Sequence, residues 1–438
     1  MRKILFTIAA LMAMTTGASA QKLTLQECLE KGLENNYSLR ISRNKEQIAH
    51  NNATLANAGY LPSLDLNAGY NASLSSSDSK LRSTGETQEM RNSLDHGLNA
   101  GIGLSWTIFD GFNISTNYKQ LKELERMGET NTRITIEDFI ANLTAEYYNF
   151  IQQRLRLANY YYAVQLSRER LRIVEERYNI GNFSRLDYQQ AKVDFNADSA
   201  QYIKQQEIVL TSRIALNEMM AIDEVYTPIE TAETDIVADT TFQFNGLWNN
   251  LLQRNADLLL AEQNNTMAQL DYKKVLSRNY PYVRLNAGYD YSFNKYDTNS
   301  YTRRSNWGGS AGVTVGFNLW DGNRRREKRN AKIEIANAEL QRNQLELALK
   351  AELGNLWQAY RNNIQLLNLE RQNVVTAREN HEIAKERYML GDISGIEMRE
   401  AQKSLLDAEE RLISVEYQTK LCEISLLQIS GDASNYLK

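Results

Sequence analysis

Leu66-Asn-Ala-Gly-Tyr70 occurs a second time, unchanged, as Leu285-Asn-Ala-Gly-Tyr289. Three further pairs of similar segments keep the same order along the two halves of the chain. Asn36-Tyr-Ser-Leu39 matches Asn255-Ala-Asp-Leu258, Ser105-Trp-Thr-Ile-Phe-Asp-Gly111 matches Gly316-Phe-Asn-Leu-Trp-Asp-Gly322, and Glu176-Arg-Tyr-Asn-Ile-Gly181 matches Glu386-Arg-Tyr-Met-Leu-Gly391. Self-similarity in a fixed order indicates a duplicated architecture. We therefore predict a tandem duplication: a first repeat at 21–225, an inter-repeat linker at 226–244 and a second repeat at 245–438. The linker is rich in acidic and β-branched residues, and we expect it to be exposed.

The first twenty residues have the pattern of a secretory signal peptide. Arg2 and Lys3 precede a short apolar core, and Ala18-Ser-Ala20 forms a small-residue cleavage site. No cysteine follows the cleavage site directly, so no lipid anchor is expected. The remaining chain has no long apolar run, which argues against a helical membrane span. A net charge of −4 gives no basic excess that would point to nucleic acid.

The repeated segments contain strict alternation of apolar with small or polar residues. The apolar set comprises Leu64, Leu66, Ala68, Tyr70, Ala72 and Leu74, and the same pattern recurs at 98–108, 283–293 and 311–319. A period of two predicts strands with one apolar face and one polar face. We predict strands at about 63–75, 94–109, 282–294 and 306–320.

Two readings of these strands are possible: a soluble sheet with one face on a core, or strands that cross a membrane. Their length of about ten residues suits a tilted membrane crossing. Aromatic residues gather at one end, as in the interfacial girdle of outer-membrane proteins. The expected membrane-interface aromatics are Tyr60, Trp106, Phe109, Tyr280, Tyr282, Phe317 and Trp320. The membrane reading is therefore favoured. The polar loops Ser75–Ser93 and Asn294–Ser305 would then face outside.

Four strands cannot close on themselves, and an open sheet edge is not tolerated in lipid. We therefore expect the chain to oligomerise into a barrel. Eight strands from a dimer would leave an interior that side chains nearly fill. The small residues of the polar face favour a wider bore and hence three or more chains, and this reasoning alone does not separate three from four.

Long proline-free segments with helical apolar spacing follow each pair of strands. We predict helices at about 112–180, 184–220, 323–390 and 395–429. The longer ones would reach about 100 Å, far beyond an ordinary globular helix, which indicates coiled coil. Gly181 and Gly391 end helices at the hairpin tips. The predicted fold is thus mainly α, with a strand hairpin and a long helical hairpin in each copy.

The sequence shows no constellation that would support an enzyme, a metal site or a cofactor. His50, His96 and His381 are scattered and lack metal-ligand spacing. Cys28 and Cys422 could form a disulfide in an exported protein. We expect them instead to be isolated small apolar residues in helices.

Taken together, the repeated segments resemble the TolC-like outer-membrane efflux family over the whole mature chain. The residues that carry the resemblance are Asn36, Asn255, Asp110-Gly111, Asp321-Gly322, Arg177-Tyr-Asn-Ile-Gly181 with Ser184-Arg-Leu-Asp187, and Arg387-Tyr-Met-Leu-Gly391 with Ser394-Gly-Ile-Glu397. The resemblance implies a homotrimer with a twelve-stranded transmembrane β-barrel in the outer membrane and an α-helical tunnel in the periplasm. It also implies two partners, a periplasmic adaptor and an inner-membrane transporter, and contact with outer-membrane lipid. The implied function is the exit duct of a tripartite efflux pump; the duct of a type I secretion system and a structural coiled-coil protein are the alternatives.

The resemblance also implies two groups of site residues at the tips. The periplasmic aperture would be formed by Asp187, Tyr388, Glu397 and Glu400, and the adaptor would dock on Tyr178, Gly181, Ser184, Tyr388, Gly391 and Ser394. Each of these carboxylates could equally be a solvated helix residue. A basic residue of the family's best-known member falls on Ile393 here, so closure needs another partner, for which Arg185 and Arg399 are candidates.

Overall fold

The computed structural model describes residues 21–181, 183–297 and 301–437. The predicted signal peptide, 1–20, lies outside the described residues. The chain divides into two compact units. One contains the described residues up to Asn44, Thr130–Leu259 and the chain from Gln344 onward, and the other contains Lys45–Glu129 and Leu260–Asn343. Each unit therefore takes segments from both predicted repeats. No helix within the described ranges has the length and apolarity needed to cross a membrane.

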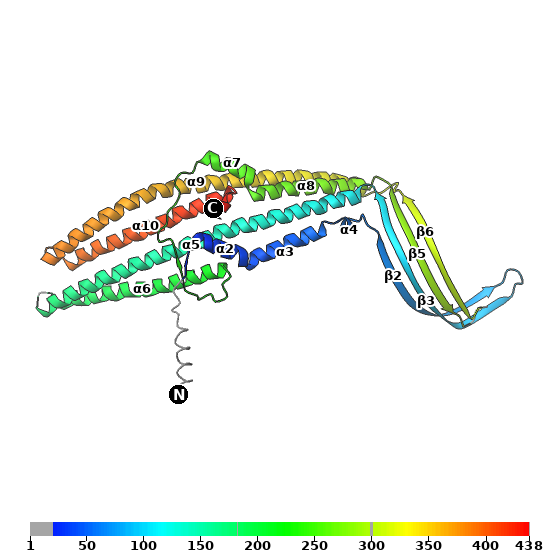
Figure 1. Cartoon of the computed structure of the whole chain (residues 1–438), viewed down its shortest axis with the longest axis horizontal. Helices are drawn as coiled ribbons and strands as arrows, with labels where there is room; N and C mark the ends of the chain where they lie inside the picture. Colours follow the sequence, from blue (N-terminus) through cyan, green and yellow to red (C-terminus); the bar gives the residue numbers. More distant parts are fainter. Residues whose placement is uncertain (1–20, 182, 298–300, 438) are drawn as a thin grey trace, which may run out of the picture. The chain divides into compact units, whose positions relative to one another are not determined.

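The long helices have equal lengths in the two repeats. Helices α5 (Asn113–Asn179) and α9 (Arg324–Leu390) have 67 residues each, and α6 (Arg185–Met219) and α10 (Gly395–Ile429) have 35 each. Figure 1 shows α5 beside α6 and α9 beside α10, as two helical hairpins. The observed ends lie within one residue of the predicted ones. The absence of Pro from these segments explains why the helices continue without a break.

Each repeat begins with shorter helices that are joined to its long hairpin by an asparagine. These are α2 (Leu25–Asn35), α3 (Tyr37–Asn52) and α4 (Leu55–Ala58) in the first repeat, and α7 (Phe244–Arg254) and α8 (Ala256–Ser277) in the second. Asn36 Nδ2 donates to the carbonyl of Met219, the last residue of α6, at 3.0 Å. Asn255 Nδ2 donates equivalently to Ile429, the last residue of α10, at 3.0 Å. The repeated Asn-x-x-Leu motif thus has the same structural role in both copies.

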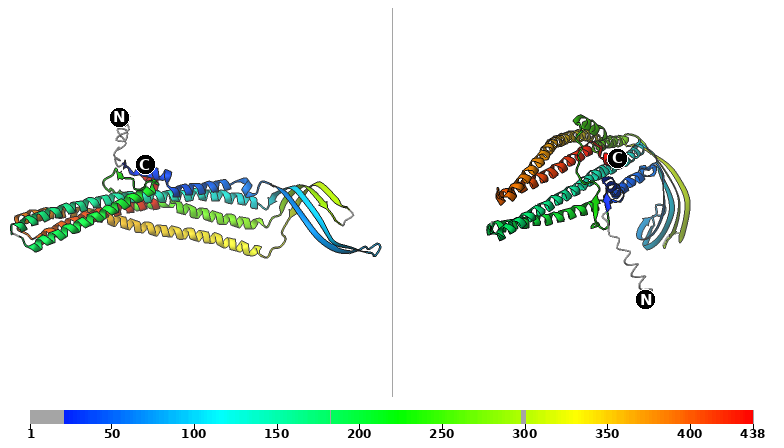
Figure 2. Two further views of the ribbon diagram at one scale, coloured as in Figure 1. Left: turned by 90° about the horizontal axis from the view of Figure 1, so that it is seen from below. Right: turned by 60° about the vertical axis from the view of Figure 1, so that its left-hand side comes forward.

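Four of the strands form an antiparallel sheet in the order β2-β3-β5-β6. Their bounds are Ser63–Lys80, Thr87–Asp110, Tyr282–Lys295 and Arg303–Gly316. The hairpin β2–β3 continues beyond the end of β5–β6 (Figures 1 and 2). Apolar side chains such as Leu66 and Val315 are exposed on the sheet. In the single chain, β2 and β6 are edge strands.

The strands differ from their predicted ranges in both loops and at the end of β6. The loop predicted at Ser75–Ser93 is mostly strand, because pairing resumes beyond an irregularity between Ser75 and Ser77 and continues to Lys80. The loop predicted at Asn294–Ser305 is shortened in the same way, since β5 reaches Lys295 and β6 begins at Arg303. Polar side chains do not stop backbone pairing. At the other end, β6 stops at Gly316, whose partner Tyr282 is the first residue of β5, so the chain beyond has no strand to pair with.

The predicted exposure of the inter-repeat linker is confirmed only in part, because Tyr226 and Val237 are exposed whereas Ile229, Thr231 and Ile236 are buried. Part of this segment forms β4 (Ile229–Thr231), which pairs in parallel with β1 (Gln21–Leu23). Ile229 and Ile236 are buried in the same cluster as Leu143 and Tyr147 of α5. Its β-branched residues therefore supply a strand and apolar contacts. A second cluster joins α7, α9 and α10 around Leu251, Leu353, Tyr360 and Leu426.

Neither cysteine is in a disulfide. Cys28 is buried in the first cluster, and this burial raises the pKa of its thiol to about 12. Because the thiolate is the reactive form, Cys28 is a structural residue at neutral pH.

Candidate functional site: the tips of the helical hairpins

Both hairpins turn at a glycine in the left-handed region. Gly181 has φ +82° and Gly391 has φ +87°, and among the described residues no atom beyond the chain neighbours lies within 4 Å of the position that a Cβ would occupy. A side chain there would meet open space, so these glycines are required by the backbone conformation and not by packing. The turns therefore set how each hairpin ends.

The helix after each turn begins with a capping box. Ser184 caps α6 together with Asp187, and Ser394 caps α10 together with Glu397. The carboxylate of Glu397 accepts from the Ser394 backbone N–H at 2.7 Å. This hydrogen bond, aided by one from the Ser394 hydroxyl, lowers the pKa of Glu397. Two of the predicted aperture carboxylates thus have a local role that the Ser-x-x-acid pattern itself indicates.

The tyrosines at equivalent positions of the two tips differ in exposure. Tyr178 is 37% exposed and stacks on Tyr188, with ring centroids 5.5 Å apart. Tyr388 is only 2% exposed and packs with Val174, Ala191 and Met398 in the tip cluster. Burial also raises the pKa of Tyr388. The Tyr388 side chain is thus inside the hairpin packing, and the expected docking of an adaptor at the tips stays a prediction.

Arg177 connects the tip of α5 to the tip of α9. Its guanidinium carbon lies 5.3 Å from the centroid of the Phe183 ring and 5.5 Å from that of Tyr388. Its Nη2 donates to the carbonyl of Met389 at 2.9 Å. One arginine thus holds both hairpins through ring faces and a backbone carbonyl.

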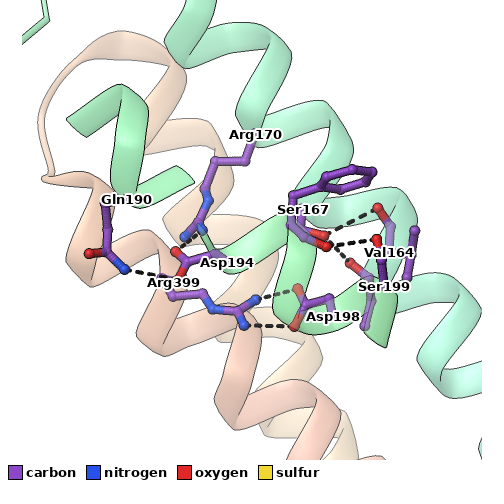
Figure 3. A network of polar contacts seen from close by, with 10 residues as sticks. Val164, Ser167, Arg170, Gln190, Asp194, Asp198, Ser199 and Arg399 are labelled. Atoms are coloured by element: carbon purple, nitrogen blue, oxygen red, sulfur yellow. Dashed lines mark hydrogen bonds and ion pairs between the residues drawn. The ribbon is translucent and has the colours of Figure 1, made fainter. Parts of the chain in front are cut away.

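A network of charged side chains lies next to the tip cluster (Figure 3). Arg170 of α5 pairs with Asp194 of α6, which also accepts from Gln190 Nε2 at 3.0 Å. Arg399 of α10 donates two hydrogen bonds to Asp198 of α6, both at 2.8 Å. The bond with Asp198 raises the pKa of Arg399.

Arg399 is therefore an ionic connection between the two hairpins. The sequence suggested Arg399 as a basic partner in closure but did not suggest Asp198 or Arg170. The other candidate, Arg185, is exposed and forms no ion pair in the described part of the chain. Ile393 packs at the edge of the tip cluster.

A cavity of about 410 Å³ lies between the tips. Its lining includes Asp187 of α6, Tyr388 of α9 and Glu400 of α10. The structure thus brings three of the four predicted aperture residues together. Glu397 is one turn away and is occupied by its capping box.

The predicted interface aromatics lie where the sheet meets the helices. Trp106 Nε1 donates to the carbonyl of Tyr60 at 2.8 Å. Phe112, which the sequence reasoning missed, has φ 72° and packs between Phe109 and Tyr280, with centroid distances of 5.2 and 5.7 Å. Phe317 and Trp320 are exposed and lie just beyond the end of β6.

Tyr282 does not belong with these aromatics. The guanidinium of Arg284 lies over its ring at 4.6 Å from the centroid. Because side chains two residues apart in a strand share a face, Tyr282 is on the same face as Arg284 and opposite the apolar Val283.

This combination of a duplicated strand hairpin and a duplicated long helical hairpin, with exposed apolar strands, is the architecture of an outer-membrane channel. The sequence model of a family described as "Outer membrane efflux protein" matches residues 28–221 and 247–432. The chain belongs to this family. The outer membrane protein TolC of Vibrio cholerae serotype O1 is 23% identical over 99% of this chain and 96% of its own length.

Solved structures have the same fold. A membrane protein from Pseudomonas aeruginosa gives a TM-score of 0.77 at 17% identity, covering 94% of this chain and 91% of its own. VceC from Vibrio cholerae gives 0.73 at 18% identity, covering 93% and 96%. The CmeC channel of Campylobacter jejuni gives 0.76 at 17% identity, covering 93% and 86%. The resemblance predicted from the sequence is confirmed: the protein is an outer-membrane exit duct of an efflux pump.

Proposed function

We propose that three copies of the chain form the duct, with four strands each in a twelve-stranded barrel and the long helices forming a periplasmic tunnel. It receives its substrates from an inner-membrane transporter through a periplasmic adaptor. The open edges of β2 and β6 support oligomerisation, because unpaired backbone groups at a sheet edge are not tolerated in lipid. The exposed apolar residues of the strands support contact of the sheet with lipid.

We further propose that the tips are closed in the resting duct and that the Arg399–Asp198 pair holds them closed. The observation that carries this proposal is the two-bond contact from α10 to α6. The Arg399 and Asp198 side chains are only 25% and 12% exposed. Removing one partner would leave the other partly buried and unpaired, which is unfavourable. Asp187, Tyr388 and Glu400 then form the neighbourhood through which the tips separate.

The test is single-channel conductance in planar bilayers. Arg399→Gln and Asp198→Asn should each raise the mean conductance several-fold, and the double variant should add little because both remove one pair. Arg378→Gln is a matched control, since Arg378 pairs with Glu409 at 2.9 Å within the second hairpin only. The exchanged variant, Arg399→Asp with Asp198→Arg, should recover low conductance. Wild-type conductance in both single variants would exclude this pair from closure.

A further inference from the structure

The cavity between the tips has the size and wall of a small-molecule site. Its volume of about 410 Å³ is within the range found for ligand pockets in proteins. Apolar side chains come from both hairpins: Val174, Phe183 and Ala191 from the first, and Tyr388, Ile393 and Ile396 from the second. A ligand with an apolar body would therefore contact both hairpins at once.

The uncompensated charge of the cavity is negative. The two arginines in the lining have carboxylate partners, because Arg170 pairs with Asp194 and Arg399 pairs with Asp198. Asp187 and Glu400 also line the cavity, and neither has a basic partner among the described residues. Within the described part of the chain, the carboxylate of Asp187 accepts only from the N–H and hydroxyl of Ser184 in the capping box. An added cation would thus meet two carboxylates that no other cation neutralises.

Among the described residues, one buried polar atom in the cavity wall also lacks a hydrogen-bond partner. Tyr388 is 2% exposed, and its hydroxyl has no hydrogen-bond partner among the residues that the structure describes. The hydroxyl lies 3.9 Å from the position that a Cβ on Gly395 would occupy, and Gly395 itself lines the cavity. A buried hydroxyl without a partner is unfavourable, so a donor or acceptor in the cavity would gain by satisfying it.

We propose that this cavity binds amphipathic amines, meaning small molecules with an aromatic or aliphatic body and one ammonium group. The ammonium donates to the Tyr388 hydroxyl and lies between the carboxylates of Asp187 and Glu400. The body packs on Phe183, Ile393 and Ile396. A neutral molecule of the same shape lacks the charge interaction, and a small hydrophilic cation lacks the apolar contact.

An occupant would oppose opening of the tips. It contacts α6 and α10 together, so its affinity is higher for the present arrangement than for one in which the hairpins have separated. This consequence rests on the proposed closure at the tips, whereas binding itself does not require it.

The test of binding uses the purified full-length protein in mild detergent and isothermal titration calorimetry near pH 7. The probe is 2-(2-naphthyl)ethylamine, compared with 2-(2-naphthyl)ethanol, which has the same body without charge, and with ethylamine, which has the charge without the body. We expect the naphthyl amine to bind at least about tenfold more tightly than either comparison compound, as loss of a charged hydrogen bond implies.

Two variants locate the site. Glu400→Gln and Tyr388→Phe should each weaken binding of the amine by about five- to tenfold. Tyr388→Phe keeps the ring and removes a hydroxyl with no partner to lose, so weaker binding would not reflect a damaged fold. Glu386→Gln is the matched control, because Glu386 is an exposed acid of α9 outside the cavity lining and its loss should leave binding unchanged.

Three outcomes would overturn the proposal or its consequence. Equal binding of the naphthyl alcohol, or wild-type affinity in both Glu400→Gln and Tyr388→Phe, would mean that the cavity is not an amine site. If the amine binds but the open fraction of the channel does not fall, the proposed effect on opening is wrong and the binding site stands. The closure proposal is tested separately, by the conductance of the Arg399 and Asp198 variants without ligand.

Discussion

At the residue scale, Ser394 and Glu397 show how one local contact can account for an acid at a position predicted to be functional. Ser394 Oγ accepts from the backbone N–H of Glu397 at 3.3 Å, and the Glu397 carboxylate accepts in return from the N–H of Ser394. Glutamine at this position can make the same return contact. The charge of Glu397 and its capping role can therefore be separated by substitution.

Ser394→Ala should loosen the first turn of α10, because the N-cap acceptor is lost. N-cap deletions typically cost about 1 kcal/mol, which corresponds to roughly fivefold faster local opening. Hydrogen exchange of the Glu397 and Met398 amides, which both donate to Ser394, measures this directly. Glu397→Gln should leave exchange of these amides close to wild type, and wild-type exchange in Ser394→Ala would contradict the capping role.

The capping contact also predicts a pH dependence with a definite sign. The Ser394 N–H lowers the pKa of Glu397 below its ordinary value of 4.5, so the ionised form is favoured in the folded tip. The stabilisation is fully present above pH 4.5 and is lost as the pH falls through the lowered pKa. Protection of the Ser394, Glu397 and Met398 amides, corrected for intrinsic exchange, should decline only in that acidic range. Glu397→Gln should lack the step, and the same decline in this variant would assign the step to another group.

At the element scale, the two turns have room for a larger side chain but require a backbone conformation that most residues disfavour. Open space surrounds the missing Cβ of both Gly181 and Gly391, while φ is positive at both. The cost of a substitution therefore comes from the backbone, about 1–2 kcal/mol for an ordinary residue and less for asparagine. This difference provides a graded test of whether the turns present the docking surface.

Gly391→Val should weaken capture of the duct by its periplasmic adaptor, whereas Gly391→Asn should keep most of it. The reason is that valine disfavours positive φ and asparagine tolerates it. Pull-down with the adaptor measures capture, and a native gel confirms that the oligomer is intact. Undiminished capture by an intact Gly391→Val oligomer would show that the adaptor docks elsewhere.

At the scale of the whole molecule, the proposed assembly depends on the exposed apolar face and the two open edges of the sheet. Native mass spectrometry in mild detergent should show three chains. Val313→Arg places a charge among the exposed apolar residues and should reduce the amount of assembled protein in the membrane, since a basic residue on a lipid-facing position costs about 2–4 kcal/mol at mid-depth. Thr314→Arg, on the opposite face of the same strand, should be tolerated. A stable monomer in mild detergent would refute the proposed assembly.

Periodic patterns made most of the fold predictable from the sequence. The 3.6- and 2-residue periods located the long helices and the strands, and the glycines located the tips. The length of β2–β3 was not predictable, because its outer part is polar and is held by backbone pairing. Burial of Ile229 and Ile236 was missed because it depends on β1 and α5, which are distant in the chain. Arg399 and Asp198, 201 residues apart, show the same limit at the site: no local pattern reveals a pair formed by folding.

The equal lengths of the two helical hairpins constrain how this protein can change its length. One residue inserted in α9 alone would shift its tip by about 1.5 Å and turn it by about 100°. That change would carry Tyr388 away from Arg177, and the Ser394 turn that follows would carry Arg399 away from Asp198. Insertions that keep these contacts must be matched in all four long helices and add close to whole heptads. The lengths of the two helical hairpins are therefore coupled. A longer or shorter duct can arise from this chain only by equal insertions or deletions of discrete size in both repeats.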